Sequence, residues 1–285
     1  MLLVGLLIGT AQAGNIKVVA STVPSNGDVN PYGIVVVPVT MGSLTAGNLL
    51  ISNFNNSGNL QGTGTTIVQI TPSGTVSLFA QIDAANLPDP CPGGVGLTTA
   101  LGRIAERLGC GWQLADHGRH LGYGRCGMPA RSRQQGQRAE TFYGSLLIGP
   151  WDMTASDNGT TPSLFFSNVL NGTVAGGGNA VHGGTVVRMD LNIAKGSQPS
   201  IQSMTVIGSG FAERADLAAL VIGPTGVHLS GRGDQGDDSG QVLYVADRLN
   251  NRIASISKAM IHTTSARTGD TVSRGGSIND PAGCW

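Results

Sequence analysis

The most acidic loop of the sequence carries the residue types that bind a hard divalent cation. Asp234, Asp237 and Asp238 lie within the glycine-rich run at residues 232–240. Carboxylate oxygens on a flexible loop suit Ca²⁺, which accepts oxygen ligands in variable geometry. The run lacks the glutamate that completes an EF-hand loop, and acidic, glycine-rich turns also join strands without binding metal. An ordinary acidic turn is therefore the leading interpretation, and a Ca²⁺ site at the three aspartates is the alternative.

The other chemistry-bearing residues form no recognisable catalytic set. His182, His228 and His262 are widely separated, and no second histidine or acidic residue lies at a ligand spacing near any of them. The sequence contains no Gly-x-Ser-x-Gly elbow, and the glycines at 176–178 are not followed by a lysine that would complete a phosphate-binding loop. The sequence thus predicts no catalytic residues and, apart from Ca²⁺, no cofactor.

The elements that must position these groups are short strands, and the clearest pair lies near the C-terminus. The apolar run Leu243–Asp247 leads through Asn250 and Asn251 into a second run, Arg252–Ile256. Asparagine tolerates left-handed backbone angles, so this pattern predicts a β-hairpin. Within the hairpin we expect three side chains in the core, those of Tyr244, Ile253 and Ile256, and one outside, that of Ala254.

Asp247 and Arg252 flank this turn and are its charged residues. We expect Asp247 to accept hydrogen bonds from backbone N–H groups of the turn. Arg252 is expected to pack its aliphatic stem along the sheet. Direct pairing of the two side chains and a catalytic role are the alternatives.

Looser copies of the hairpin recur upstream and share an order of residues. Each copy opens with a proline, has a second strand that starts with leucine and ends with Asn or Asp, and continues into a third strand. The three copies open at Pro31 with Gly33, at Pro150, and at Pro224 with Gly226. Their second strands run from Leu49 to Asn53, from Leu164 to Asn168 and from Leu243 to Asp247. Their third strands start at Thr66, Thr185 and Arg252. Gly33 is expected to permit a tight bend, and Pro92 and Pro281 mark two further openings. Such units need stacked neighbours, so the repeat predicts an all-β fold, a β-propeller of four-stranded blades.

The hairpin also carries a family resemblance. The run Leu243–Asp247, followed by Asn250, Asn251 and Arg252, resembles the NHL-repeat signature, and the Pro-x-Gly openings are similar to the start of that repeat. Taken with an N-terminal export signal, the chain resembles the bacterial extracytoplasmic NHL-repeat propellers. That resemblance implies the fold more strongly than any activity, because NHL-type blades occur in protein-binding platforms, extracellular scaffolds and a few enzymes that use the central channel.

Charge and hydropathy restrict which compartment and which kinds of partner are expected for this protein. Seventeen basic and seventeen acidic residues balance to zero, so neither nucleic acid nor an anionic membrane surface is an expected partner. Residues 1–13 combine an apolar run with the small-x-small sequence at 11–13, which predicts a signal peptide and a periplasmic or extracellular location. A buried first strand is the alternative. Residues 14–285 then form a single propeller domain, and no other stretch approaches the roughly 20 apolar residues of a membrane span.

Residues 101–138 depart from the repeat. Seven of the seventeen basic residues lie here, all of them arginine, and the strand alternation is lost. A helical insertion and a basic loop are two interpretations. The third is a shifted reading frame, because codons allowed for this segment, read one base later, can encode the strands and turns of a missing blade. The sequence of the coding DNA distinguishes these interpretations.

The cysteines and the chain end leave further questions open. Cys91, Cys110, Cys126 and Cys284 allow three full disulfide pairings, and the spacing selects none. The unit that opens at Pro281 stops at Trp285. We therefore expect about four whole blades and a fragment, against roughly five or six blades in an intact relative, with an open edge that lowers stability.

These features together predict a secreted or periplasmic propeller that acts as a binding or scaffold module for a protein or small-molecule ligand. The loops at residues 55–65 and 170–184 are expected on one face. One alternative is a metal-dependent hydrolase of the lactonase or esterase type with a divalent ion in its channel. The other is the non-functional product of a damaged gene.

Overall fold

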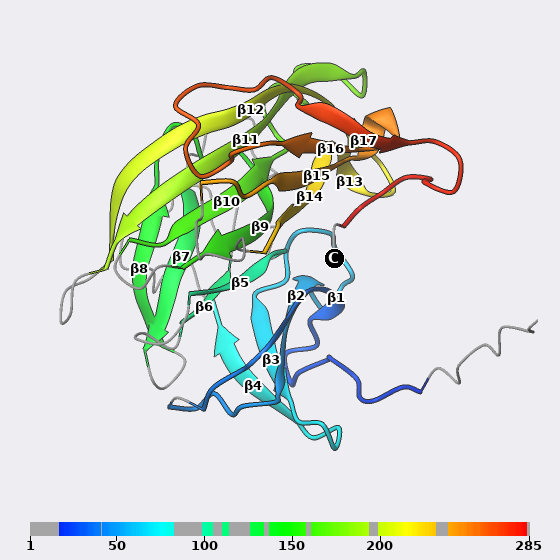
Figure 1. The fold of residues 1–285 in the computed structure, drawn as a ribbon. Coiled ribbons are helices and arrows are strands. Elements are labelled where there is room, and N and C mark those ends of the chain that lie inside the picture. Colours follow the sequence, from blue (N-terminus) through cyan, green and yellow to red (C-terminus); the bar gives the residue numbers. More distant parts are fainter. Residues whose placement is uncertain are drawn as a thin grey trace, which may run out of the picture.

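The computed structural model describes residues 17–40, 42–82, 99–104, 110–113, 126–133, 137–157, 161–193, 199–231 and 239–283. Within these ranges the chain forms β-strands and a 3₁₀ helix, η2 (Arg248–Asn250), and no α-helix (Figure 1). The predicted all-β class is confirmed for the described residues. No helix among them has the length and apolar character needed to cross a membrane.

Three antiparallel sheets of four or five strands make up most of the molecule, and none of them closes into a barrel. The first contains β1 (Val29–Val36), β2 (Leu49–Asn55), β3 (Thr66–Ile70) and β4 (Val76–Gln81) in that order. The next contains β9 (Pro150–Ser156), β10 (Ser163–Asn168), β11 (Val181–Asn192), β12 (Ser200–Asp216) and β13 (Leu220–Ile222). The last contains β14 (Pro224–Leu229), β15 (Leu243–Asp247), β16 (Arg252–Ile256) and β17 (Asp270–Arg274).

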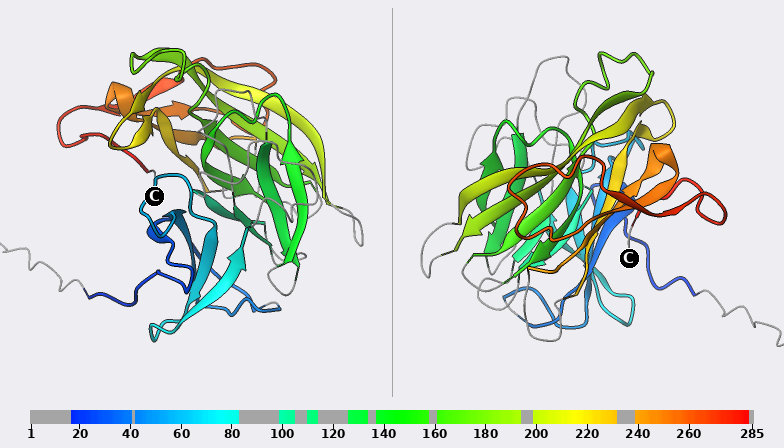
Figure 2. Two further views of the ribbon diagram at one scale, coloured as in Figure 1. Left: turned by 180° about the vertical axis from the view of Figure 1, so that it is seen from behind. Right: turned by 45° about the horizontal axis from the view of Figure 1, so that its top comes forward.

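These three sheets are the three units that the repeat predicted. In each one, consecutive strands are neighbours, so every unit is an up-and-down meander. The middle sheet is larger than predicted, because β12 continues to Asp216 and turns back into β13. The first strands of successive units also lie next to one another: β5 (Leu101–Ile104) contacts both β1 and β9, and β9 contacts β14 (Figures 1 and 2).

The atypical segment contains strands, which the sequence did not predict. β5 pairs with β6 (Cys110–Gln113), and β7 (Cys126–Arg133) pairs with β8 (Gln137–Tyr143). Residues 101–104 are therefore a strand, whereas residues 105–108, where a helical turn was one interpretation, lie outside the described residues. Two two-stranded sheets stand where a fourth whole unit was expected. Residues 91 and 284 lie outside the described ranges, so the cysteine pairing stays open, and the shifted reading frame stays a prediction.

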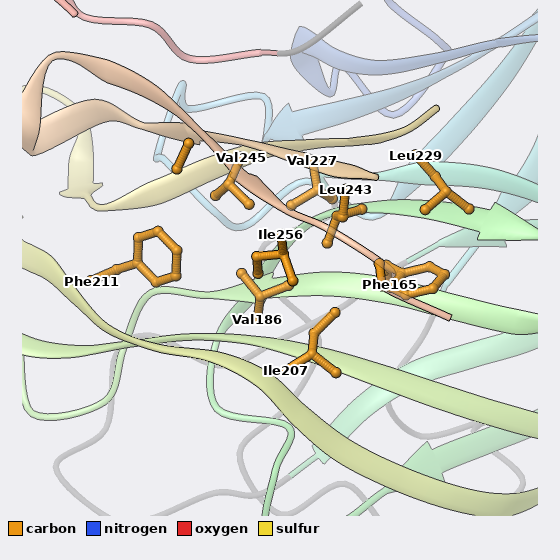
Figure 3. Packing of buried hydrophobic residues seen from close by; sticks show 11 residues of the cluster. Phe165, Val186, Ile207, Phe211, Val227, Leu229, Leu243, Val245 and Ile256 are labelled. Carbon is orange, nitrogen blue, oxygen red and sulfur yellow. The ribbon is translucent and has the colours of Figure 1, made fainter. Parts of the chain in front are cut away.

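Apolar side chains fill the spaces between successive sheets. Between the middle and last sheets, Phe165, Val186 and Phe211 pack against Val245 and Ile256 in a cluster that Figure 3 shows. All five side chains are essentially inaccessible to water. Burying a large apolar side chain contributes about 1.5–3 kcal/mol, so this interface is a main source of stability for both sheets. Similar clusters join β5 to the first sheet and residues 100 and 142 to the middle one.

The orientation of side chains in the C-terminal hairpin differs in part from the prediction. Ile256 is buried as expected, but Ala254 is fully buried and Ile253 is only partly covered. Side chains in a strand alternate between the two faces, so Ile253 and Ile256 cannot both point inward without a bulge between them. Tyr244 was predicted in the core and is also partly exposed, because it lies on the outer face with Ile253.

Candidate ligand-binding face

One end of the three large sheets is built from the same polar cross-strand pair. A residue near the end of the second strand bonds to the residue that faces it on the third strand. Asn53 Nδ2 lies 3.2 Å from Thr66 Oγ1, Asn168 Nδ2 lies 2.9 Å from Thr185 Oγ1, and Arg252 Nε lies 2.7 Å from Asp247 Oδ2. We call this end of the sheets the loop face. The three predicted pairs of equivalent residues are thereby confirmed, but the predicted strand bounds are not exact, because β2 continues to Asn55 and β11 begins at Val181.

The repeated prolines lie opposite these pairs. Pro31, Pro150 and Pro224 are the cross-strand partners of Asn53, Asn168 and Asp247. The strand register shifts immediately next to each proline. Proline has no N–H to give to the sheet, so a break in the pairing at this position costs little. The prolines therefore mark equivalent corners of the three units, as the repeat predicted.

Gly33 has a different role from the one expected. It is not in the left-handed backbone region, so it does not serve a tight bend. Instead, a Cβ at this position would collide with the carbonyl oxygen of Thr99. Glycine is required because the next unit approaches the β1 backbone closely.

Buried serines link each unit to the next at this end. Ser52 Oγ accepts a hydrogen bond from Gly33 N at 2.9 Å and donates one to Thr99 O at 2.8 Å. Ser167 repeats the arrangement: its Oγ accepts from Asp152 N at 3.3 Å and donates to Thr225 O at 3.0 Å.

Thr99 is thus equivalent in position to Thr225, which follows Pro224 at the start of the last sheet. The second unit therefore begins close to Thr99. Pro92, which was predicted to open it, lies earlier in the chain and outside the described residues. Gly226 belongs to β14, beside the irregularity between Pro224 and Val227.

The Asp247 and Arg252 side chains form a buried ion pair. Asp247 is completely buried and Arg252 nearly so. Besides Asp247, the guanidinium donates to Thr271 Oγ1 and Thr268 O, both at 2.8 Å, and so connects β15, β16 and β17. The carboxylate also accepts from the side-chain amide of Asn250. The pairing alternative is therefore correct for Asp247, and the expected bonds to backbone N–H groups are replaced by bonds to side chains.

The turn itself follows the sequence pattern at one of its two asparagines. Asn251 has φ of 52° and lies in the left-handed region, as expected for asparagine. Asn250 belongs to the 3₁₀ turn η2 instead. Asn250 donates to the Asp247 carboxylate and Asn251 Oδ1 accepts from Asp280 N, so both asparagines serve the geometry of the turn.

An aromatic cluster joins the first and middle sheets at the loop face. The rings of Tyr32, Phe54 and Trp151 pack with centroids 5.5–5.9 Å apart, and Trp151 Nε1 donates to the Tyr32 hydroxyl. Val169 and Val221 complete the cluster. Burial raises the pKa of Tyr32 to about 12. The cluster fixes the ends of β2 and β10, where the two longer loops begin.

The loops at residues 55–65 and 170–184 leave this end of the sheets, since they follow Phe54 and Val169 of the aromatic cluster. Gln61 of the first loop donates to Ala218 O in the β12–β13 turn. Three apolar side chains at these connections are exposed, namely Leu60, Val174 and Leu217. The loop face thus presents apolar tips on a framework held by buried polar pairs.

Two ion pairs lie at the edge of this face. Arg248 forms two hydrogen bonds with the carboxylate of Asp280, and Arg214 Nη2 lies 2.9 Å from Asp216 Oδ2. The bonds to Arg248 lower the pKa of Asp280. Two backbone N–H groups, from Ala219 and Ala218, lower the pKa of Asp216. Both carboxylates therefore stay charged at neutral pH.

Asp152 is a carboxylate inside the framework. Its Oδ2 accepts a hydrogen bond from Val227 N at 2.9 Å and so ties β9 to β14. Burial raises its pKa to about 6, although this N–H and that of Met153 oppose the shift. Sequence reasoning placed this residue only within a repeat opening, and no local pattern distinguishes it as a buried acid.

The structure describes three of the histidines considered in the sequence, but not the three aspartates of the acidic loop. Asp234, Asp237 and Asp238 lie outside the described residues, so the Ca²⁺ site stays a prediction. His182 and His228 are exposed and His262 is half-buried, on different parts of the two later sheets. Within the described ranges, no three His, Cys, Asp or Glu side chains come together as metal ligands.

The geometry of the loop face identifies a framework without assigning a substrate. Comparison of the chain with protein-family models and with curated proteins gives no match, so the NHL-repeat family stays a prediction.

Proposed function

We propose that this protein is a β-propeller of the NHL-repeat type that works as a binding or scaffold module in the periplasm or outside the cell. The observation that carries the proposal is the repeated loop face. Three sheets share one polar framework, while the connections that leave that framework differ in length and sequence. Rigid scaffolds with variable loops are a common way of building binding sites.

The propeller arrangement is supported by the order of the units. The first strands of successive units are neighbours, and each sheet packs an apolar face against the next. In a propeller the first strand of every blade is the innermost one, so β1, β5, β9 and β14 correspond to positions around a central axis. The serine bridges from Ser52 to Thr99 and from Ser167 to Thr225 are then contacts between neighbouring blades.

The chemistry of the loop face favours a protein or peptide ligand. The exposed tips Leu60, Val174 and Leu217 offer apolar contacts, and the nearby pairs Arg248–Asp280 and Arg214–Asp216 offer both signs of charge. Protein interfaces typically combine an apolar centre with a polar rim of this kind. A chain with no net charge fits such a partner better than it fits nucleic acid.

The test is capture of partners from the extracytoplasmic fraction by purified protein. The loop-face variant carries Leu60→Asp, Val174→Asp and Leu217→Asp, and the control carries Leu78→Asp on β4, an equally exposed apolar site away from the loops. We expect a partner that binds the wild type and the control equally and binds the loop-face variant at least tenfold more weakly. Equal binding by all three proteins would exclude the loop face as the site. The protein purified from that fraction should also begin at residue 14.

A further inference from the structure

The side chain of Glu213, on β12, is fully buried next to the β10–β11 connection of the loop face. Its cross-strand partner is Val181, at the start of β11. Among the described residues, neither carboxyl oxygen has a hydrogen-bond partner of normal geometry. Buried polar groups are nearly always paired, so this carboxyl group calls for a chemical explanation.

Two glycines make the space that the carboxyl group occupies. A Cβ on Gly183 would collide with the Asn171 carbonyl oxygen and would lie 2.8 Å from Glu213 Oε1. A Cβ on Gly223 would lie 3.0 Å from the Cβ of Glu213 and 3.2 Å from Val169 Cγ1. The carboxyl group therefore lies in a niche between β11 and the start of β14, where its Oε1 and the carbonyl oxygen of Asn171 both border the space above Gly183.

Two acceptor oxygens that border the same buried space repel unless a proton or a cation lies between them. Burial raises the pKa of Glu213 to about 8, and the backbone N–H of Asn171 offsets this only in part. No charged side chain among the described residues contributes to the shift. The nearest ones in sequence are directed elsewhere, because His182 is exposed and Arg214 pairs with Asp216. The neutral acid is thus the form that this niche accommodates at neutral pH.

We propose that Glu213 is a protonation-controlled latch for the β10–β11 connection. As the neutral acid, its hydroxyl donates to the Asn171 carbonyl oxygen and holds the start of that loop against β12. When the proton is lost, the two oxygens repel, and the loop separates from β12 so that water can reach the carboxylate. The latch makes one of the loop-face connections responsive to alkaline pH, and it stands whether or not the loop face binds a partner.

Direct titration of the carboxyl group tests the latch in the wild-type protein. The chain contains three glutamates, Glu106, Glu140 and Glu213, so ¹³C-labelled glutamate gives three carboxyl signals in an NMR titration. Glu213→Gln assigns one signal by its disappearance, and Glu106→Gln with Glu140→Gln assigns it by elimination if the first variant does not fold. We expect the Glu213 signal to titrate near pH 8. A midpoint close to the ordinary value of about 4.3 would overturn the proposal.

Hydrogen exchange tests what the proton controls. Protection of the amides at residues 171–184 should fall at least tenfold between pH 7 and pH 9.5 in the wild type, after correction for the intrinsic pH dependence of exchange. Glu213→Gln keeps a donor toward the Asn171 carbonyl at every pH and should keep its protection. Asp216→Asn, at the half-buried end of the same strand, is the matched control and should behave like the wild type. Equal loss of protection in the wild type and in Glu213→Gln would show that Glu213 is not a latch.

Discussion

Exchange of the buried Asp247–Arg252 pair for the pair found in the other two sheets gives the sharpest test of the repeated framework. At the equivalent positions the first and middle sheets have Asn53 with Thr66 and Asn168 with Thr185. The last sheet has a fully buried carboxylate 2.7 Å from a guanidinium that is 6% exposed. The variants Asp247→Asn and Arg252→Thr, alone and together, convert this sheet to the design of its neighbours.

The single variants should each be strongly destabilising. Asp247→Asn leaves the Arg252 guanidinium buried without a counterion, and Arg252→Thr leaves the Asp247 carboxylate in the same state. Removing one partner of a buried ion pair costs about 3–5 kcal/mol, because an uncompensated charge stays in the interior. At about 2–4 °C per kcal/mol for a chain of this order of size, each single variant should lower the melting temperature by roughly 10 °C.

The double variant should recover much of this loss. Asparagine and threonine at these positions can form the same amide-to-hydroxyl bond as Asn168 and Thr185. What remains lost is the pair of bonds from Arg252 to Thr271 Oγ1 and Thr268 O and the packing of the arginine stem. We expect a net cost of about 1–2 kcal/mol for the double variant, a coupling of several kcal/mol between the two sites.

Urea denaturation followed by circular dichroism measures these differences, provided that the dependence of the unfolding free energy on urea is unchanged. Arg248→Ala is the matched control. It removes the neighbouring pair with Asp280, whose side chain is 52% exposed, and should cost at most about 1 kcal/mol. If the costs of the two single variants simply add in the double variant, Asp247 and Arg252 do not act as a pair and the repeated framework is not interchangeable between sheets.

The remaining predictions concern the serine bridges, Asp152, the acidic loop and the gene. Ser52→Ala and Ser167→Ala should each lower stability by about 1–3 kcal/mol in urea denaturation, because each removes two hydrogen bonds between backbone groups and a buried serine, whereas Ser77→Ala on β4 should cost under about 0.5 kcal/mol. The pKa of Asp152 is raised to about 6, so its contribution to stability is lost as pH rises from about 4 through 6. Asp152→Asn should reduce the dependence of the melting temperature on pH over that range. An unchanged dependence would contradict the raised pKa of Asp152. If the acidic loop binds Ca²⁺, millimolar Ca²⁺ should raise the melting temperature, and neutralising Asp234, Asp237 and Asp238 together should abolish the rise. The DNA sequence of codons 95–145 should contain a one-base shift that restores strand-forming residues; if no such shift exists, residues 101–138 are native.

The framework was predictable because its positions use residue types with specific local chemistry. Proline marks a place where the sheet lacks an N–H donor, and Asn or Asp marks a strand end whose side chain bonds across to the next strand. These signals depend on a few consecutive residues and on a repeat spacing, both of which are visible in a sequence. They located the ends of β2, β10 and β15 without any knowledge of how the sheets pack.

The face of a strand that points inward was less predictable. Isoleucine is ordinarily a core residue, which favoured Ile253 over Ala254. In the structure, Arg252, Ala254 and Ile256 share the inner face, because the buried ion pair at Arg252 and the packing of Ile256 fix the register together. Because Ala254 is small, the facing sheet can approach closely at this position. A small residue type does not by itself indicate, in a sequence, that the side chain is buried.

The buried acids could not be predicted from local sequence at all. Asp152 bonds to Val227, and Glu213 lies beside Asn171 and between two glycines that are distant in the chain. Their environments arise only when separate units come together. Long-range packing, and not residue type, makes these two carboxyl groups unusual.

The three large sheets close the same corner with connections of very different lengths. Residues 248–251 make a tight turn in the last sheet, whereas residues 56–65 and 169–180 form longer loops in the other two. In each sheet the polar pair lies where the pairing between the second and third strands ends, so side-chain bonds close the hairpin close to the start of the connection. Loop length then adds little to the cost of folding, since closure entropy grows only slowly with length. A framework of this kind lets the loops change without loss of the fold, which is the property that a binding module with interchangeable specificity requires.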